Sequence, residues 1–203
     1  LRCFENDDIT HVSGKVDPIA DFEVVETELM LADMESLEKR KAGVVKKANS
    51  GDKEAKAQVA LIDLALAELN EGRPARRAVV SKDDTKAWNM LQLLTSKPVL
   101  FVANVDEDSA ATGNEYSSRV EARATEEGAA CVVISAQIEA ELALLDEPDR
   151  SEYLETLGLE EPGLTRLIHT GYDLLDLQTY FTVGPKESRA WTIRKGWSAP
   201  KAA

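Results

Sequence analysis

Two short apolar runs separated by a helical pattern limit the folds open to this chain. Residues 99–103 and 131–134 predict buried strands, and residues 116–127 between them have the pattern of a helix. More helix is predicted through Leu145 and then over 150–157 and 163–174. Short apolar strands that alternate with helices are typical of parallel βαβ units, in which helices cover both faces of the sheet. The sequence therefore predicts an α/β domain.

The segment before this α/β pattern predicts two antiparallel helices. Apolar residues recur at spacings of mostly three, four or seven after Pro18, and again up to about Leu69. An Asn-Ser-Gly-Asp turn at 49–52 separates the two helices, and "NEGRP" at 70–74 ends the second, because glycine caps a helix and proline cannot continue one. Such a hairpin is either an ordinary amphipathic pair or a protruding arm that binds a partner.

A further helix is predicted in "SKDDTKAWNMLQLLTS". Ser81 and Asp84 resemble a capping box, and Trp88, Leu91 and Leu94 form an apolar stripe.

The last segment, "LQTYFTVGPKESRAWTIRKG", predicts two strands around a Gly-Pro turn at 184–185. They are typical of the first hairpin of a small β-rich domain. Its aromatic and basic residues form either an RNA-facing surface or a half-buried sheet face. These residues are Arg189, Trp191, Arg194, Lys195 and Trp197.

The net charge and the number of cysteines exclude several classes of function. A net charge of −13 argues against a non-specific binder of nucleic acid or of membrane surfaces, although a local basic patch can override that average. Apolar runs stay well short of the roughly 20 residues that span a bilayer. Cys3 and Cys131 are too few for a disulfide framework or a zinc site, which indicates buried thiols in a reducing cytosol. The chain opens on Leu1 and closes soon after a strand, so we expect a fragment.

Polar residues follow both predicted strands of the α/β domain. Asn104 and Glu107 come after the first strand, and Ser135 and Ala136 after the second. Ligands of open α/β sheets bind at the carboxyl ends of strands, so these residues predict a binding site. By itself the pattern is also that of an ordinary polar loop.

The corresponding loops of P-loop GTPases read Asn-Lys-x-Asp and Ser-Ala-Lys and hold guanine. Here Val105 replaces the lysine and is expected to pack near the base, and Glu107 replaces the aspartate. A longer carboxylate cannot be assumed to make the same paired contact with guanine, so adenine becomes a plausible base.

Four segments carry a resemblance to a known family. "RCFENDDITHVSGKVDP", "FVANVDED", "LGLEEPGLTRLI" and "LLDLQTYFTVGPKESRAWTI" closely resemble the YchF/Obg-like ATPases, a branch of the P-loop NTPases. The resemblance implies a ribosome-associated, cytoplasmic ATPase that hydrolyses ATP to ADP and phosphate with Mg²⁺, and GTP less well. It also implies that His11 is a catalytic residue that orients the attacking water, whereas without it a loop histidine bonded to a backbone carbonyl is the simpler interpretation.

The resemblance also divides the chain. It implies a P-loop NTPase segment at 1–20, a hairpin insertion at 21–80, the C-terminal part of the NTPase domain at 81–176, and the start of a TGS domain at 177–203. The printed sequence contains no G-x-x-x-x-G-K-[ST] motif and no switch regions, so the magnesium ligands are expected outside it and the fragment alone is expected to be inactive.

The expected partners are ATP, or GTP as an alternative, and the ribosome through its large subunit. RNA contact through the TGS strands is a further expectation, and neither a membrane nor a second copy of the chain is expected as a partner. Two other functions stay open: a non-enzymatic module that binds the ribosome or another protein, and a GTP-specific GTPase.

Overall fold

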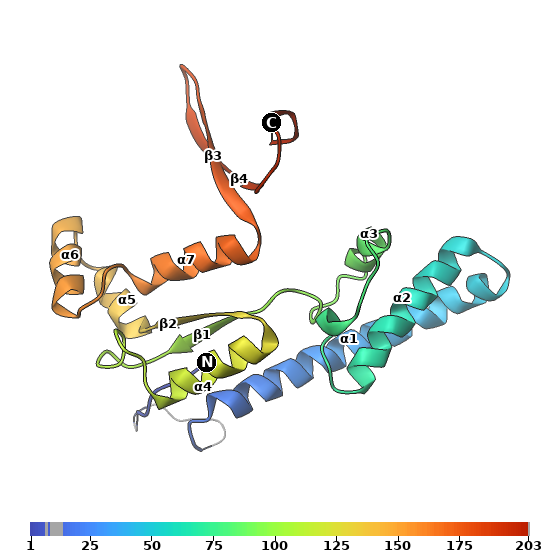
Figure 1. Cartoon of the computed structure of the whole chain (residues 1–203), viewed down its shortest axis with the longest axis horizontal. Coiled ribbons are helices and arrows are strands. Elements are labelled where there is room, and N and C mark those ends of the chain that lie inside the picture. Colours follow the sequence, from blue (N-terminus) through green and yellow to red (C-terminus); the bar gives the residue numbers. More distant parts are fainter. Residues whose placement is uncertain (7, 9–13, 203) are drawn as a thin grey trace. The chain divides into compact units, whose positions relative to one another are not determined.

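The chain divides into two compact units in the computed structural model, which describes residues 1–6, 8 and 14–202 (Figure 1). Unit 1 comprises Leu1–Ile19 and Val99–Ala203, and unit 2 comprises Ala20–Pro98. The finer division into four segments stays a prediction. None of the helices in the described part of the chain is both long and apolar enough to cross a membrane.

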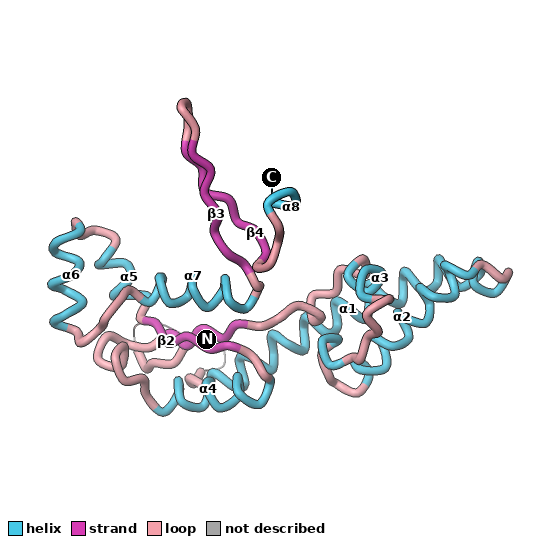
Figure 2. The backbone as a smooth tube through the Cα atoms, turned by 45° about the horizontal axis from the view of Figure 1, so that its top comes forward, coloured by secondary structure: helices cyan, strands magenta, loops and turns pink. Residues whose placement is uncertain are grey.

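Unit 1 is built on the predicted parallel sheet. Strand β1 (Leu100–Asn104) pairs in parallel with β2 (Ala130–Ile134), in a register that runs from Leu100 opposite Ala130 to Asn104 opposite Ile134. The chain start extends this sheet, because Arg2 forms a parallel bridge with Asn104 and the Cys3 amide donates to the Asn104 carbonyl at 2.7 Å. Helices α4 (Glu115–Glu127) and α7 (Gly163–Leu174) cover opposite faces of β1 and β2 (Figures 1 and 2). The α/β fold class is confirmed.

Helix α4 begins and ends at clear sequence signals. The Asn114 side chain accepts from the Ser117 amide at 3.0 Å, while the Ser117 hydroxyl accepts from the Asn114 amide at 2.8 Å, which completes a capping box. Gly128 ends the helix at φ 65°, a left-handed conformation that favours glycine.

Two short helices lie beyond β2. Helix α5 (Ala136–Leu142) starts directly at the end of the strand, and α6 (Glu147–Thr156) follows it. They bury a small apolar cluster together with the loop after β1, and this cluster consists of Ala110, Ile138, Leu142 and Leu154. The loop after β1 is therefore anchored on α5 and α6.

The C-terminal segment forms the predicted hairpin. Strands β3 (Leu177–Val183) and β4 (Ser188–Arg194) pair antiparallel, and a short helix, α8 (Ala199–Ala202), follows. Trp191 is 42% exposed and donates from its indole to the Thr182 hydroxyl at 2.9 Å, and the Arg189 guanidinium lies over its ring.

Unit 2 is a helical hairpin with a small apolar core. Helix α1 (Pro18–Asn49) runs into the turn at 50–52, and α2 (Lys53–Asn70) begins at Asp52, whose carboxylate accepts from the Ala55 amide at 3.0 Å. Side chains of both helices fill the core with residues from the segment that follows. The core residues are Met30, Leu37, Leu61, Ile62, Ala65, Leu66, Leu69, Ala75, Trp88, Leu91 and Leu93.

The helix predicted across 81–96 is mostly absent, because only α3 (Thr85–Asn89) forms within it. The Ser81 hydroxyl accepts from the Asp84 amide at 3.1 Å, but the predicted capping box is incomplete: the helix begins later, with Asp84 as its N-cap residue, and the Asp84 carboxylate accepts from the Ser81 hydroxyl. The chain then leaves the helix, and Gln92 adopts a φ of 55°. The predicted stripe is wrong at Leu94, which is 41% exposed.

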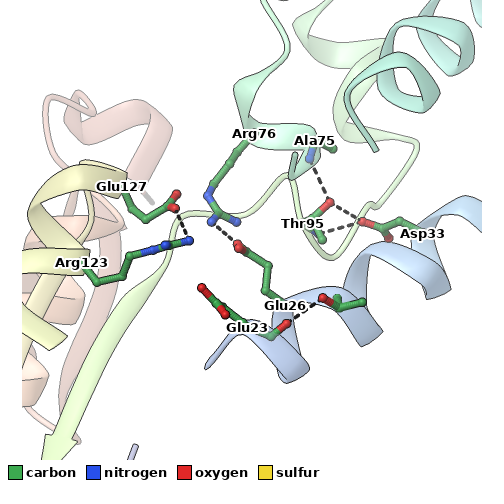
Figure 3. A network of polar contacts seen from close by, with 9 residues as sticks. Glu23, Glu26, Asp33, Ala75, Arg76, Thr95, Arg123 and Glu127 are labelled. Atoms are coloured by element: carbon green, nitrogen blue, oxygen red, sulfur yellow. Dashed lines mark hydrogen bonds and ion pairs between the residues drawn. The ribbon is translucent and has the colours of Figure 1, made fainter. Parts of the chain in front are cut away.

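Tertiary hydrogen bonds explain why the helix stops. Asp33 on α1 is 3% exposed, and its carboxylate accepts from the Leu94 amide at 2.8 Å. It also accepts from the Thr95 amide at 2.8 Å and from the Thr95 hydroxyl at 2.7 Å (Figure 3). The same hydroxyl accepts from the Ala75 amide at 3.0 Å, at the start of the 3₁₀ turn η1 (Ala75–Arg77). These bonds replace the intrahelical partners that a longer helix would offer.

Candidate functional site

The two predicted loops meet at the carboxyl edge of the sheet. Asn104, the last residue of β1, is paired with Ile134, the last residue of β2. The loops that follow the two strands therefore begin side by side at the same edge of the sheet. The Asn104 Oδ1 atom accepts from the Ala136 amide at 2.9 Å, and the Val105 amide donates to the Ile134 carbonyl at 2.8 Å. The sequence prediction that these loops lie together agrees with this geometry, and the Asn104 side chain joins them directly.

Two polar atoms at this edge are buried without a hydrogen-bond partner among the described residues. They are Oε1 of Glu107 and the hydroxyl oxygen of Ser135, which is the N-cap residue of α5 but makes no side-chain capping bond. A buried polar group that lacks a partner costs about 1–3 kcal/mol, and more when it is charged. A ligand that bonded to these atoms would recover that free energy, so the pair marks this edge as a candidate binding site.

Val105 occupies a different environment. Its side chain is only 2% exposed, so it packs inside the protein. The expected contact between Val105 and a base stays a prediction. A lysine at this position would bury its ammonium group, which is unfavourable without a charged partner.

A close approach of backbone to side chain holds the end of β2 in place. The Gly163 amide, at the start of α7, donates to Oε1 of Glu139 on α5 at 2.7 Å. A Cβ atom on Gly163 would lie 2.8 Å from Cγ2 of Ile134 and 3.0 Å from the same Glu139 oxygen. Sequence reasoning missed the roles of Gly163 and Glu139, because their contact depends on how α5 and α7 pack at the end of β2.

The acidic groups near this edge also affect a tyrosine. Tyr153 on α6 donates from its phenol to the Glu141 carboxylate. This hydrogen bond, then burial, and then the charges of Glu141 and Glu107 raise the pKa of Tyr153 to about 12. The phenol therefore stays a hydrogen-bond donor at neutral pH.

The histidines fall at different places. His11, predicted to orient water, lies outside the described residues. His169 is an exposed residue on α7, as expected for a helix surface. Within 1–6, 8 and 14–202, no three histidine, cysteine or acidic side chains are grouped so that they could hold a metal ion.

Comparison with known proteins relates the whole chain to one family. Over all 203 residues the chain is 48% identical to the "Ribosome-binding ATPase YchF" of Haemophilus ducreyi, and it covers 56% of that protein. Its identity to the protein of the same name in Bacillus subtilis is 45% over 205 aligned residues. The chain belongs to the YchF family.

Structure and a family model agree with this YchF assignment. The solved "Structure of the Schizosaccharomyces pombe YchF GTPase" matches with a TM-score of 0.84 and 34% identity, over 99% of this chain and 55% of that one. The family model YchF-GTPase_C, described as "Protein of unknown function (DUF933)", matches residues 177–203, which include the β3–β4 hairpin. The chain thus spans about 56% of the length of the YchF relatives it matches.

Proposed function

We propose that this chain supplies the base-binding part of a ribosome-associated ATPase. The observation that carries the proposal is the joined pair of loops after β1 and β2, in which Glu107 and Ser135 keep buried polar atoms without a partner. The likeness to proteins named ribosome-binding ATPases supports it.

The chemistry of the two unpartnered atoms suits adenine. A carboxylate oxygen such as Oε1 of Glu107 accepts hydrogen bonds, and the exocyclic amino group of adenine donates them. The Ser135 hydroxyl can donate to an acceptor such as the adenine N1 atom. In this proposal Asn104 acts as a positioning residue, since its side chain holds the Ala136 amide and so fixes one loop against the other.

The hydrolytic step belongs to the whole protein. In this proposal Mg²⁺ and the phosphates are held by residues outside the printed sequence, and His11 orients the attacking water. Positioning supplies most of the catalysis in phosphoryl transfer, so a neutral imidazole suits that role. The whole protein is proposed to be a cytoplasmic monomer that binds the large ribosomal subunit, with the β3–β4 hairpin as the start of a TGS domain that contacts RNA.

The test measures nucleotide affinity in the intact protein that contains this chain. We expect Glu107→Ala to weaken ATP binding by about 10- to 100-fold, which corresponds to the loss of one hydrogen bond to a charged group. Asp108→Asn is the matched control, because Asp108 is an exposed carboxylate one residue away. ATP affinity that is equal in all three proteins would refute the proposed base site.

A GTPase is the second candidate, because the solved relative is named a GTPase. The same titration with GTP separates the two. Glu107→Asp restores the side-chain length found in guanine-binding loops, so it should raise the affinity for GTP relative to ATP. Val105→Lys is unsuitable for this test, because Val105 is buried and a lysine there would change stability as well as nucleotide binding.

A further inference from the structure

The charges along α1 are strongly segregated. Residues 18–38 contain seven acidic residues and no lysine or arginine. Residues 39–56, which form the end of α1, the turn and the start of α2, contain seven basic and two acidic residues. This segment is named the basic end of the hairpin. Its basic residues are Lys39, Arg40, Lys41, Lys46, Lys47, Lys53 and Lys56.

Contacts within the hairpin and the dipole of α1 explain the positions of only some of these basic residues. Arg40 donates to the Leu91 carbonyl at 2.8 Å, and Lys41 pairs with Asp63 on α2 at 2.6 Å. Lys46 and Lys47 lie in the last turn of α1, where cations favour the helix dipole.

Lys53 and Lys56 have no such explanation. They lie in the first turn of α2, where the positive end of the helix dipole disfavours a cation. Of the acidic residues nearby, Asp52 is engaged as the N-cap, and Glu54 alone offsets the charge in that turn. Repulsion among these cations destabilises the hairpin slightly, so a purely structural reason for placing them together is missing.

Five of the lysines at the basic end are open to solvent. Each is exposed, and none of their ammonium groups makes a hydrogen bond or an ion pair within the described part of the chain. The five are Lys39, Lys46, Lys47, Lys53 and Lys56. In contrast, none of the exposed large apolar side chains found in the described residues lies between 39 and 56. Protein partners are usually bound through buried apolar or aromatic anchors, which this surface lacks.

We propose that the basic end of the hairpin binds the phosphate backbone of RNA. Lysine carries a compact positive charge with three donors, which suits phosphate oxygens in any orientation. A set of exposed lysines with no apolar anchor fits a sequence-independent contact that depends on charge. The inference rests on the proposed association with the ribosome, because it assigns ribosomal RNA as the part of that particle that this surface contacts.

The geometry of the hairpin suits such a contact. At about 1.5 Å per residue, the 32 residues of α1 extend about 48 Å, and the basic residues are confined to its C-terminal third and the first turn of α2. The acidic stretch at 18–38 would be repelled by phosphates. Contact is therefore restricted to the end that carries the turn.

The test compares two triple variants of the intact protein. In the first, Lys47, Lys53 and Lys56 are replaced by glutamine. In the second, the matched control, Lys82, Lys86 and Lys97 are replaced by glutamine; these lysines are also exposed and belong to the same unit. Binding to a fluorescein-labelled RNA hairpin is measured by anisotropy over a series of salt concentrations, and binding to purified ribosomes is measured by co-sedimentation.

We expect the first variant alone to lose affinity for both probes. Each lost phosphate contact removes about 0.7–0.9 from the slope of log K against log salt, so the slope should fall by about 2–3. Equal slopes for the first variant and the unmodified protein would overturn the inference. If RNA binding is unchanged but ribosome binding is lost in the first variant, an acidic protein is the partner and RNA is excluded.

ATP affinity, measured on the same samples, separates this inference from the proposed function. The first variant should bind ATP normally, because the three lysines belong to unit 2 and the base-binding loops to unit 1. Unchanged RNA binding together with normal ATP binding would refute only the role of the basic end. Unfolding curves of all samples test whether the substitutions leave the fold intact.

Discussion

Gly163 provides a direct test of how tightly the end of β2 is held. In Gly163→Ala, the new methyl group would lie 2.8 Å from Cγ2 and 3.1 Å from Cβ of Ile134, and 3.0 Å from the Glu139 carboxylate. The Ile134 Cβ atom is fixed to the backbone, so the strand end or the start of α7 has to shift. Overpacking of this kind costs about 1–3 kcal/mol.

Gly171 is the matched control on the same helix. A Cβ atom there would meet nothing within 4 Å, and alanine favours a helix interior over glycine by about 1 kcal/mol. Gly171→Ala should therefore leave stability unchanged or raise it. The two alanine variants should differ by about 2 kcal/mol in the free energy of unfolding, measured by urea denaturation followed by circular dichroism.

The affinity of the same two variants for ATP provides a second test. Ile134 directly precedes Ser135, and its carbonyl accepts from the Val105 amide. A shift of Ile134 would disturb both loops, so Gly163→Ala should also weaken ATP binding by the intact protein, whereas Gly171→Ala should not. If Gly163→Ala were as stable as Gly171→Ala and bound ATP as well, the close packing described for this edge would be wrong.

Three further predictions concern other parts of the chain. Asp33→Asn should lower the free energy of unfolding by about 2–4 kcal/mol, because an amide cannot accept all three hydrogen bonds. The control Glu35→Gln, at an exposed position on the same helix, should change the free energy of unfolding by less than about 0.5 kcal/mol, and equal stability of the two variants would contradict the network. Burial raises the pKa of both Cys3 and Cys131 to about 11, so little of either thiol should be in the reactive thiolate form at pH 7. The rate of alkylation should therefore increase about tenfold per pH unit until the pH approaches 11, and fast alkylation at neutral pH would refute this prediction. His11→Ala should lower kcat for ATP hydrolysis by the intact protein with little change in ATP affinity, and an unchanged kcat would exclude the role of this histidine in orienting water.

Local patterns predicted most of the fold. The strands at 100–104 and 130–134 and helix α7 lie within a residue of their expected bounds, because burial on both faces and helical periodicity leave strong signals. The helix expected through residue 96 was wrong because its end depends on Asp33, which lies about 60 positions earlier in the chain. The spacing of residues within a short stretch of sequence cannot predict a contact between positions so far apart.

The candidate site was predictable only in part. The positions of Asn104 and Ser135 after neighbouring strands indicated that their loops would meet. The burial of Val105, the approach of Gly163 and the unpartnered oxygen of Glu107 all depend on how α5, α6 and α7 pack, which the spacing of residues does not encode. The net charge of −13 also concealed the basic end of the hairpin, since an average over 203 residues hides a local excess of lysine.

The separation of charge along α1 has a consequence for the rate of encounter with a polyanion. A helix that is acidic over 18–38 and basic beyond residue 38 experiences a torque in the field of a negatively charged surface. That torque turns the basic end toward the surface before contact, so a larger share of diffusional collisions arrives in a productive orientation. The benefit is expressed in the association rate, and it should fade as added salt shortens the range of the field to a few ångströms.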